Sequence, residues 1–497
     1  MSSKSAEIAG VQVATGHLIG GQRHASAAHF AVRSPIDGRE LAQVSAGGPD
    51  EVDAAIDAAR SAFPAWARLG PEGRGPILRR FAAAIRARGE DLARVETEDN
   101  GSLLLGNRRN IVPRAATNIG FFADFAEQLE PPVIRGPVVD NRVRYEPAGV
   151  AALITPWNAP LMLSTWKIGP ALAAGDTVVL KPPEWAPLTG SLLGDLALEA
   201  GVPAGVLNVV QGPGECAGAI LAAHPGIARL SFTGSPETAR SIARSTAEHL
   251  VPVSFELGGK SPFIVFPDAD LEKAARTLSR QFINAGQVCL AGTRVLVQAS
   301  VASELLERTR AASAALPVGD PRRAETRIGP LITPEHLARV RGFVERALGA
   351  GARVVFGGEM DACGALYHQP TLLTGVAPDA EIVQREVFGP VLTWQEFEDD
   401  DEAVALGNAT DYGLAAMVYT ADRARAERVA AELVAGTVWV NCYFVRDLSA
   451  PFGGARQSGI GREGGRWSFD FFCDVKNVAI DRTSFDAAPE PGGRGDG

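Results

Sequence analysis

The segment VAALITPWNAPLMLSTWKIGPALAAGDTVVLKPPE, residues 150–184, predicts the fold class. It holds two short apolar runs rich in β-branched residues, Val150 to Thr155 and Thr177 to Leu180, which are typical of buried strands. Between them lies a longer helix-like segment that starts near Pro160. A strand, a helix and a second strand in this order form the repeating unit of a parallel sheet. The segment therefore predicts an α/β fold.

The same alternation continues as far as Glu256. Further strand-like runs cover Val206 to Val210, Ala228 to Phe232 and Val251 to Phe255, and further helix candidates start near Leu188, Glu215 and Pro236. The strands end in turn residues, namely Pro156-Trp157-Asn158, Lys181-Pro182-Pro183-Glu184, Gln211-Gly212-Pro213-Gly214, Thr233-Gly234-Ser235 and Gly258-Gly259. Ligands bind beyond the carboxyl ends of the strands in open α/β sheets, so we expect these turns to converge on one crevice.

Helices and a second α/β unit flank this sheet. Upstream, Asp50 is expected to be the N-cap of an amphipathic helix, and a longer helix is expected from Ile77 to Glu98. Downstream, strand Phe263 to Phe266 and an amphipathic helix that stops near Gly286 begin the second unit. Cys289 lies just past that stop, so we expect it on a loop.

Two β-rich segments, Pro132 to Glu146 and Phe471 to Ile480, lie outside both units. Exposed strands of this kind usually pair with another chain, so we expect a homodimer or a homotetramer. The end of the chain, residues 485–497, reads FDAAPEPGGRGDG and is expected to be a flexible tail.

Composition excludes several classes of protein. The chain has 497 residues, and its 48 Lys and Arg against 58 Asp and Glu give a net charge of −10, which argues against binding nucleic acid. The five cysteines form no C-x-x-C pair, which favours a reducing compartment. The N-terminus lacks the apolar core of a signal peptide, and the most apolar stretch contains Lys167 and Asp176, which disfavours a membrane span. We therefore expect a cytoplasmic protein with a small-molecule substrate.

Several residues in the predicted turns and loops are candidates for chemistry. Cys289 stands on a loop framed by glycines, although a single cysteine is more often a small buried apolar residue. Glu256 ends a strand, where a carboxylate reaches a cleft or is simply structural. The glycines of residues 212–218 form either a phosphate-binding turn or a tight turn, and Thr233-Gly234-Ser235 is a second candidate for an anion site. None of the seven histidines lies in a metal-ligand spacing, so no metal is expected.

Seven ordered motifs give the chain a resemblance to the aldehyde dehydrogenase superfamily over nearly its whole length. They are Thr155-Pro156-Trp157-Asn158, Lys181-Pro182-Pro183-Glu184, Phe232-Thr233-Gly234-Ser235, Glu256-Leu257-Gly258-Gly259-Lys260, Gly286-Gln287-Val288-Cys289, Glu386-Val387-Phe388-Gly389-Pro390 and Pro451-Phe452-Gly453-Gly454. The resemblance implies a Rossmann-like NAD-binding domain (residues 1–131 and 149–257), an α/β catalytic domain (258–440) and a small β oligomerisation arm (132–148 and 470–484). It also implies NAD(P)-dependent oxidation of an aldehyde to a carboxylic acid.

The resemblance assigns roles by motif. By its place in the motifs, Cys289 resembles the nucleophile of the family. Glu256 resembles its general base, and Asn158 resembles the residue that donates to the oxyanion. The implied cofactor-binding residues are Thr155, Pro156, Trp157, Lys181, Glu184, Thr233, Gly234, Ser235, Leu257, Glu386 and Phe388. Glu184 is expected to favour NAD, because a carboxylate accepts hydrogen bonds from a ribose 2′-hydroxyl and repels a 2′-phosphate.

The residue types suit this chemistry. An aldehyde has no leaving group, whereas a thiolate adduct forms a tetrahedral carbon whose oxyanion can expel hydride. Asn158 and the backbone N–H of Cys289 are expected to stabilise that oxyanion. A carboxylate such as Glu256 is then needed to activate water for hydrolysis of the thioester.

Two arginines suggest the substrate. Arg446 precedes the Pro451-Phe452-Gly453-Gly454 motif, and Arg114 and the run GIGREGG at 459–465 resemble the 2-hydroxymuconic semialdehyde dehydrogenase branch, where matching positions bind a substrate carboxylate. The same resemblance places Trp166 and Phe452 in the substrate pocket. Alternatively, Arg446 forms only a structural contact with Asp447 or with a second subunit.

The chain departs from the branch at two positions. Ser449 stands where the branch usually has a second arginine, and Ala159 replaces a larger residue. The expected substrate is a carboxylate-bearing semialdehyde, such as 2-hydroxymuconate semialdehyde from aromatic catabolism. One alternative is a broad dehydrogenase of small neutral aldehydes. A non-catalytic relative is a further alternative, which the presence of Cys289, Glu256 and Asn158 opposes.

Overall fold

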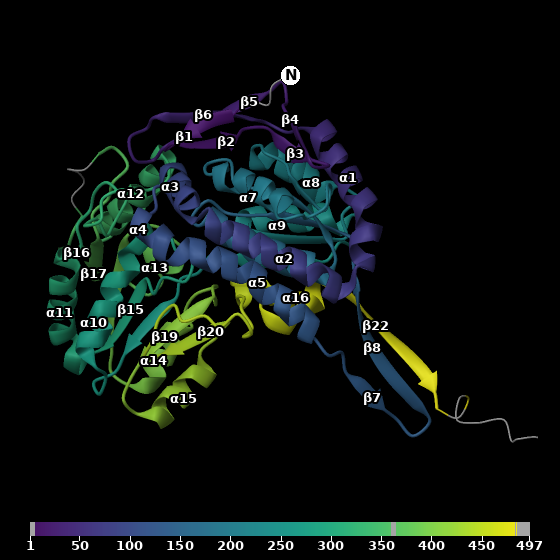
Figure 1. Cartoon of the computed structure of the whole chain (residues 1–497). Coiled ribbons are helices and arrows are strands. Elements are labelled where there is room, and N and C mark those ends of the chain that lie inside the picture. The colour runs from purple at the N-terminus through teal and green to yellow at the C-terminus, as the bar shows by residue number, and fades with distance from the viewer. Residues whose placement is uncertain (1–4, 359–363, 483, 485–497) are drawn as a thin grey trace, which may run out of the picture.

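The protein is described here by a computed structural model, which covers residues 5–358, 364–482 and 484 (Figure 1). The predicted tail, 485–497, lies outside these residues. Within them, two large sheets of eight and seven strands form the body, and a three-stranded sheet projects from it. The α/β fold class is confirmed.

The first large sheet is built around the predicted parallel strands. They are β9 (Val150–Ile154), β10 (Thr177–Lys181), β11 (Leu207–Val209), β12 (Arg229–Gly234) and β13 (Val253–Leu257). They pair in the order β13-β12-β9-β10-β11, all parallel, with Ile154 opposite Lys181 and Thr233 opposite Glu256. Because this register aligns the carboxyl ends, the turns after these strands meet at one edge of the sheet.

The edges of the first sheet were not predicted. On one side β21 (Gly459–Ile460) pairs with β13, and on the other β3 (His17–Ile19) and β4 (Gln22–His24) continue beyond β11. These strands have two or three residues each, which is too short for a period-two pattern. Two further hairpins, which lie at the top of Figure 1, consist of β1 (Ser5–Ile8) with β2 (Val11–Ala14) and β5 (His29–Arg33) with β6 (Glu40–Ser45).

Helices cover both faces of the first sheet. They are α1 (Pro49–Arg68), α2 (Gly70–Ala87), α3 (Gly89–Asn100), α4 (Leu104–Gly106), α5 (Val112–Gln128), α6 (Pro160–Ala174), α7 (Leu188–Glu199), α8 (Ala219–Ala223), α9 (Pro236–Ala247) and α16 (Gly465–Phe472). The predicted starts at Pro160, Leu188 and Pro236 are confirmed. Near Glu215 the chain forms a π-helical turn, Gly214–Gly218, before α8 begins.

Two predictions about the early helices were wrong. Gly48, not Asp50, is the N-cap of α1, and the Glu51 carboxylate accepts a hydrogen bond from the Gly48 N–H at 2.8 Å. The capping side chain therefore comes from the third residue of the helix. A search for a polar side chain at the N-cap position itself does not detect this arrangement. The single helix expected from Ile77 to Glu98 is interrupted at Arg88, where φ and ψ of −94° and 21° leave the helical region.

The second large sheet has the order β16-β17-β18-β15-β14-β19-β20. Its strands are β14 (Pro262–Val265), β15 (Arg294–Gln298), β16 (Arg353–Phe356), β17 (Thr371–Thr374), β18 (Val391–Phe397), β19 (Ala415–Tyr419) and β20 (Thr437–Val440). Its helices are α10 (Leu271–Ser279), α11 (Ala302–Ala314), α12 (Pro334–Gly349), α13 (Glu381–Gln384), α14 (Asp400–Gly407) and α15 (Arg423–Glu432). The expected strand at Phe263 is therefore present as β14.

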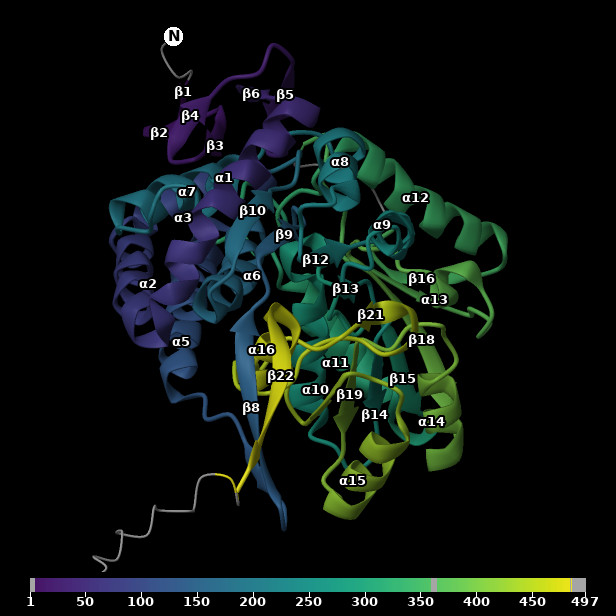
Figure 2. The ribbon, with the colours of Figure 1, turned by 90° about the vertical axis from the view of Figure 1, so that its right-hand side faces the viewer.

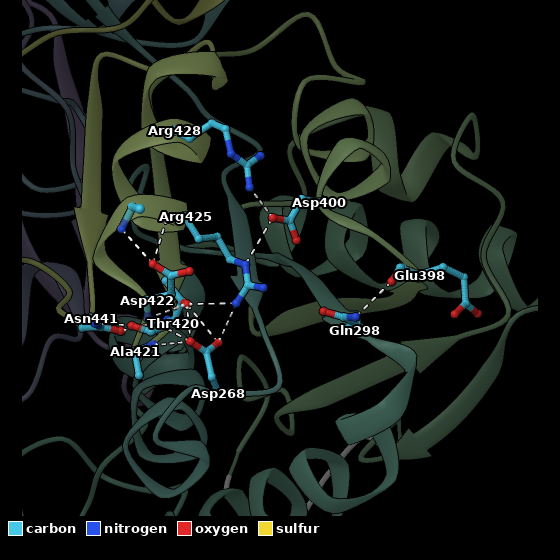
Figure 3. Close-up of polar contacts among 11 residues, drawn as sticks. Asp268, Gln298, Glu398, Asp400, Thr420, Ala421, Asp422, Arg425, Arg428 and Asn441 are labelled. Carbon is cyan, nitrogen blue, oxygen red and sulfur yellow. Dashed lines mark hydrogen bonds and ion pairs between the residues drawn. The ribbon is translucent and has the colours of Figure 1, made fainter.

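A polar cluster holds the carboxyl edge of the second sheet together (Figure 3). Asp268, which follows β14, accepts hydrogen bonds from the Thr420 hydroxyl at 2.8 Å and from the Arg425 guanidinium at 3.0 Å. Arg425 and Arg428 on α15 also pair with Asp400 on α14, at 3.2 and 2.5 Å. The loop before β15, which carries Cys289, lies at the opposite edge, because β14 and β15 are parallel. The cluster therefore stabilises the scaffold and not the site.

The predicted β-rich segments form the projecting sheet. It pairs β22 (Cys473–Asp481) with β8 (Val139–Pro147) and β8 with β7 (Val133–Arg135), all antiparallel. Figures 1 and 2 both show it extending away from the body. Arg229 on β12 anchors its base, since the guanidinium donates to the carbonyl of Phe471 at 2.6 Å and pairs with Asp474 at 2.5 Å.

None of the helices in the described part of the chain combines the length and the apolar character that crossing a membrane requires.

Candidate active site

Cys289 lies on a tightly folded loop between the 3₁₀ segment Arg280–Gly286 and β15. Asn284, Ala285 and Gly286 are consecutive residues with positive φ values of 56°, 52° and 69°. At Gly286 only glycine fits, because a Cβ atom there would come within 2.1 Å of the Gly389 carbonyl oxygen. Since non-glycine residues in this region cost about 1 to 3 kcal/mol each, the surrounding structure must hold the loop in place.

Gln287 and Asn158 supply that support. The Gln287 side chain donates to the carbonyl of Asn284 at 3.0 Å and accepts from the N–H of Ile332 at 3.0 Å. The Asn158 amide donates from Nδ2 to the Gln287 carbonyl at 2.9 Å, and the Asn284 amide donates to the Asn158 carbonyl at 3.1 Å. The structure thus brings Asn158 beside the Cys289 loop. An amide nitrogen carries two protons, so one remains for an oxyanion.

Glu256 is buried at the end of β13, with 3% of its surface exposed. Burial raises the pKa of its carboxyl to about 7, and the charge of Glu463 adds to this, while Arg446 and Lys167 act in the opposite direction. A carboxylate whose pKa lies near neutrality is suited to accept a proton and release it again.

The surroundings of the Cys289 thiol favour its protonated form. Burial raises its pKa well above the usual value, and the charges of Glu256 and Glu386 raise it further, whereas Arg446 lowers it. The thiolate is the form that attacks a carbonyl, so a neighbouring base assists by taking the proton, and Glu256 is a candidate because its charge acts on the thiol.

A buried polar network lies beneath Glu256 and was missed in the sequence. Glu463 accepts hydrogen bonds from the Lys167 ammonium at 2.8 Å, from the Trp166 indole N–H at 2.5 Å and from the Ser231 hydroxyl at 3.2 Å. Although burial opposes it, Lys167 together with these hydrogen bonds lowers the pKa of Glu463. Lys167 could have indicated this network in the sequence, because a lysine in an otherwise apolar helix requires a buried partner.

Arg446 lies between two aromatic rings. Its Cζ atom is 4.7 Å from the centre of the Trp166 ring and 3.5 Å from that of the Phe452 ring. Its Nη2 atom is buried and has no hydrogen-bond partner among the described residues. Burial lowers its pKa, while the charges of Glu256 and Glu463 raise it. The structure therefore brings Arg446, Trp166 and Phe452 together, with a guanidinium nitrogen left unsatisfied.

Two charged residues near Arg446, Asp447 and Arg114, form hydrogen bonds that do not involve its guanidinium. Asp447 accepts hydrogen bonds from the backbone N–H and the hydroxyl of Ser449, at 2.9 and 2.7 Å. The positive charge that acts on Asp447 is that of Arg114, and within the described part of the chain no ion pair joins Asp447 to Arg446. Arg114 on α5 donates to the Arg446 carbonyl at 3.3 Å, so it supports the backbone that carries the guanidinium.

The carboxyl edge of the first sheet gathers the residues expected to bind the cofactor. The Lys181 ammonium pairs with Glu184 at 2.8 Å. A Cβ atom at Gly214 would lie 3.7 Å from the Glu184 carboxylate, so this glycine leaves space beside the pair. The exposed Ser235 is the N-cap of α9, where its hydroxyl accepts from the Thr238 N–H at 3.2 Å. Thr155 instead bonds to Ser164 of α6 at 3.1 Å and holds its turn to that helix.

Glu386 and Phe388 face this edge from the second sheet. The Glu386 carboxylate accepts from the Gly259 N–H at 3.0 Å, and burial raises its pKa to about 7. A Cβ atom at Gly258 would come within 2.0 Å of that carboxylate, so only glycine permits the contact. Phe388 has a positive φ of 58° and meets the Trp157 ring edge-on at 5.3 Å between centroids.

The remaining predicted positions follow from the register. Leu257 ends β13 and lies opposite Gly234 on β12, and Pro156 precedes Trp157 in the turn after β9. Two carboxylates suited to ribose hydroxyls and a helix N-terminus suited to phosphate thus share one edge. This donor set fits a dinucleotide.

The family comparison matches residues 22–478 to the model described as the aldehyde dehydrogenase family. A 2-hydroxymuconic semialdehyde dehydrogenase of Pseudomonas sp. (strain CF600) is 43% identical over 469 residues, covering 92% of this chain and 96% of that protein. A betaine aldehyde dehydrogenase of Cereibacter sphaeroides is 40% identical over 484 residues, covering 96% and 99%.

Solved structures give the same result. An indole-3-acetaldehyde dehydrogenase of P. syringae, in complex with NAD⁺, superposes with a TM-score of 0.93 at 38% identity and covers 95% of this chain and 97% of its own. Sequence, site geometry and fold agree. The chain belongs to the aldehyde dehydrogenase family and is an oxidoreductase that acts on aldehyde groups.

Proposed function

We propose that the chain oxidises a carboxylate-bearing semialdehyde to the corresponding acid, with NAD as the hydride acceptor and Cys289 as the nucleophile. The observation that carries the substrate class is the buried, unsatisfied Nη2 of Arg446. A guanidinium held between two rings loses hydration worth several kcal/mol, and a substrate carboxylate would compensate for it. The charge of Arg446 acts on both Cys289 and Glu256, so the guanidinium lies near the groups expected to carry out the reaction.

The names of the relatives support this substrate class. The Pseudomonas relative is named for 2-hydroxymuconic semialdehyde, and a human relative, 39% identical over 457 residues, is named for 2-aminomuconic semialdehyde. Both compounds carry a carboxylate. The betaine aldehyde dehydrogenases among the relatives are named for a cationic aldehyde, which the positive charge of Arg446 disfavours.

The chain's own residues account for most of the chemistry. Glu256 accepts the Cys289 proton, and the sulfur attacks the carbonyl carbon of the aldehyde, forming a C–S bond and an oxyanion. The Asn158 amide and the Cys289 backbone N–H donate to that oxyanion. Glu184 would hold the adenosine ribose, Ser235 and the start of α9 the pyrophosphate, and Glu386 the nicotinamide ribose. When bound there, NAD supplies the hydride acceptor.

Loss of hydride from the adduct leaves a thioester on Cys289. After Glu256 has released the Cys289 proton to solvent, it takes a proton from a water molecule, whose oxygen attacks the thioester carbon. The C–S bond breaks, the acid is released, and the sulfur regains a proton from Glu256. Burial raises the pKa of Glu256 to about 7, and the charge of the buried Glu463 adds to this effect. Trp166 contributes to this network as well as to the substrate wall, since its N–H binds Glu463 and its face contacts Arg446.

The two large sheets suggest two domains with different roles. Residues 1–131 and 149–257 would bind the cofactor, 258–440 would carry the nucleophile, and 132–148 with 470–484 would form an oligomerisation arm. Between 441 and 469, β21 joins the first sheet through β13, so part of this segment extends the cofactor-binding unit. Val133, Ile134 and Val475 on the arm are at least half exposed, which favours a homodimer or homotetramer. A reduced Cys289 is consistent with a cytoplasmic location.

Arg446 gives the test of the substrate class. In the variant Arg446→Met we expect kcat/KM for 2-hydroxymuconate semialdehyde to fall about 10²-fold, because the carboxylate loses its buried partner. For propionaldehyde we expect a change of less than about threefold. The comparison of the two substrates is decisive, because any change in the pKa of Glu256 or Cys289 affects both alike.

The matched control for this test is Arg109→Met, which removes one positive charge from an exposed site near Arg114. It should leave both kcat/KM values unchanged. An equal loss on both aldehydes in Arg446→Met would show that the arginine supports the catalytic groups and does not recognise the substrate.

Glu184 gives the test of cofactor choice. In Glu184→Ser we expect the affinity for NADP to rise about tenfold or more, because the repulsive carboxylate is gone and the Lys181 ammonium becomes available to a 2′-phosphate. Calorimetric titration with NAD and NADP measures both affinities. Glu199→Ser removes the same charge at the end of α7 and should leave the NAD to NADP ratio as in the wild type. An unchanged ratio in Glu184→Ser would place cofactor discrimination elsewhere.

A further inference from the structure

One face of helix α12 forms hydrogen bonds with the segment that contains Glu386 and Phe388. The His336 ring nitrogen Nε2 is 2.7 Å from the Phe388 carbonyl oxygen, and the Arg339 guanidinium donates to the Glu386 carbonyl at 2.8 Å. Residues three apart project from the same face of a helix. Two neighbouring side chains of α12 therefore hold the backbone of the two residues expected to contact the nicotinamide ribose.

The donor in the first contact is the His336 imidazole, because a carbonyl oxygen only accepts. Its ring is buried, and burial together with the charge of Arg339 keeps its pKa below the usual value, despite the Phe388 contact. The imidazole is therefore neutral near pH 7, with its proton on Nε2. The ring also packs against Trp157 and Phe388, at centroid distances of 5.4 and 6.0 Å.

The segment needs such support. Phe388 has a positive φ of 58°, and the residues between α13 and β18 form neither a helix nor a strand. A non-glycine residue in this region is retained only where its surroundings impose it. The carbonyl of Phe388 itself accepts the hydrogen bond from His336, and the carbonyl of Glu386, two residues before it, accepts that from Arg339.

The same segment lies between α12 and the loop that carries Cys289. A Cβ atom at Gly389 would come within 2.6 Å of the Val340 side chain on α12. On its other side, the Gly389 carbonyl would lie 2.1 Å from a Cβ atom at Gly286. With no free space on either side, a displacement of this segment would be transmitted to the Cys289 loop.

We propose that His336 and Arg339 are positioning residues that hold Glu386 and Phe388 in the geometry required by the cofactor. They act through the backbone carbonyls of these two residues. The inference rests on the proposed function, since it assigns Glu386 and Phe388 to the nicotinamide ribose.

Three variants test the proposal. His336→Leu and Arg339→Met remove the donors, and His336→Gln keeps a donor in the place of Nε2. We expect the first two to weaken NAD binding to the enzyme without aldehyde about tenfold, measured by calorimetry, and to lower kcat at saturating NAD. His336→Gln should remain within about threefold of the wild type. Arg339 is exposed, so its replacement tests the proposal even if His336→Leu fails to fold.

A matched control lies on the same helix. Arg346 of α12 pairs with Glu381 of α13 at 2.7 Å, so it joins the same two elements away from Glu386. Arg346→Met should bind NAD as the wild type does. Hydrogen exchange of the backbone at 385–389, measured without cofactor, should become faster in His336→Leu and Arg339→Met and stay unchanged in Arg346→Met.

Two outcomes would overturn the proposal: a lower melting temperature with unchanged NAD affinity and kcat, or an equal effect in Arg346→Met. Failure of the wild-type chain to oxidise any aldehyde with NAD would overturn the proposed function instead. The hydrogen-exchange result distinguishes these cases, because it reports on the segment without cofactor or substrate.

Discussion

Cys289→Ala is expected to abolish aldehyde oxidation, with a fall of at least about 10⁴-fold in the rate of NADH formation. Without the thiol there is no tetrahedral adduct, so the carbonyl carbon has no oxyanion from which hydride can leave. The Asn158 amide and Glu256 remain in place, but they act on an adduct that no longer forms. Initial rates from NADH absorbance measure the effect with both a semialdehyde and propionaldehyde.

The control variants for this prediction come from the other free cysteines. Cys216 is exposed on the turn before α8, and Cys442 follows β20. Cys216→Ala and Cys442→Ala should keep wild-type rates, and Cys289→Ala should keep its affinity for NAD. Substantial turnover by Cys289→Ala would refute covalent catalysis at this residue.

Glu256→Gln is expected to separate the two halves of the reaction. Thioester hydrolysis should slow by about 10² to 10⁴-fold, because the amide cannot take a proton from water. Thioester formation should suffer less. The variant loses a base that accepts the Cys289 proton, but the loss of its charge also removes one cause of the raised pKa of Cys289, so that water can take the proton more easily. Rapid mixing should therefore show a burst of about one NADH per active site, followed by slow turnover.

The pH dependence follows from the pKa of Glu256, which burial raises to about 7. Only the deprotonated carboxylate accepts a proton, so the hydrolysis rate in the wild type should fall as the pH drops below about 7 and level off above it. In Glu256→Gln this dependence should disappear. Glu248→Gln, a substitution on the surface at the end of α9, should keep the wild-type profile. A variant that shows no burst, or keeps the same pH dependence, would remove Glu256 from the role of base.

The positions of the central strands and their parallel alignment were predictable from local pattern. The apolar runs that became β9, β10, β12 and β13 are buried on both faces, which is the environment of a parallel sheet, and they lie within two residues of their expected ends. Because parallel strands in register end at one edge, the turns after them converge without further information. The roles of Cys289, Glu256 and Asn158, in contrast, were implied by motifs shared with the aldehyde dehydrogenase superfamily.

Contacts between distant segments were not predictable in that way. Asn158 and Gln287 are 129 residues apart, and Lys167 and Glu463 are 296 apart, yet each pair forms a hydrogen bond within the site. No periodicity or spacing connects such positions. Likewise, nothing in the sequence near His336 indicates that its ring reaches a carbonyl on another element.

The sequence by itself determined the α/β fold and the turns at the strand ends, because these depend on hydrophobic period and local turn chemistry. The residue types of the reaction were implied by the motifs of the family. Only the tertiary structure decided the charge states. Burial removes water from Cys289 and Glu256 and other charges lie beside them, which raises the pKa of the thiol and raises that of the Glu256 carboxyl to about 7. It also decided that Arg446 has a nitrogen without a partner, since that depends on which side chains surround it. Desolvation and Coulomb energy vary with burial and distance, and both are properties of the folded chain.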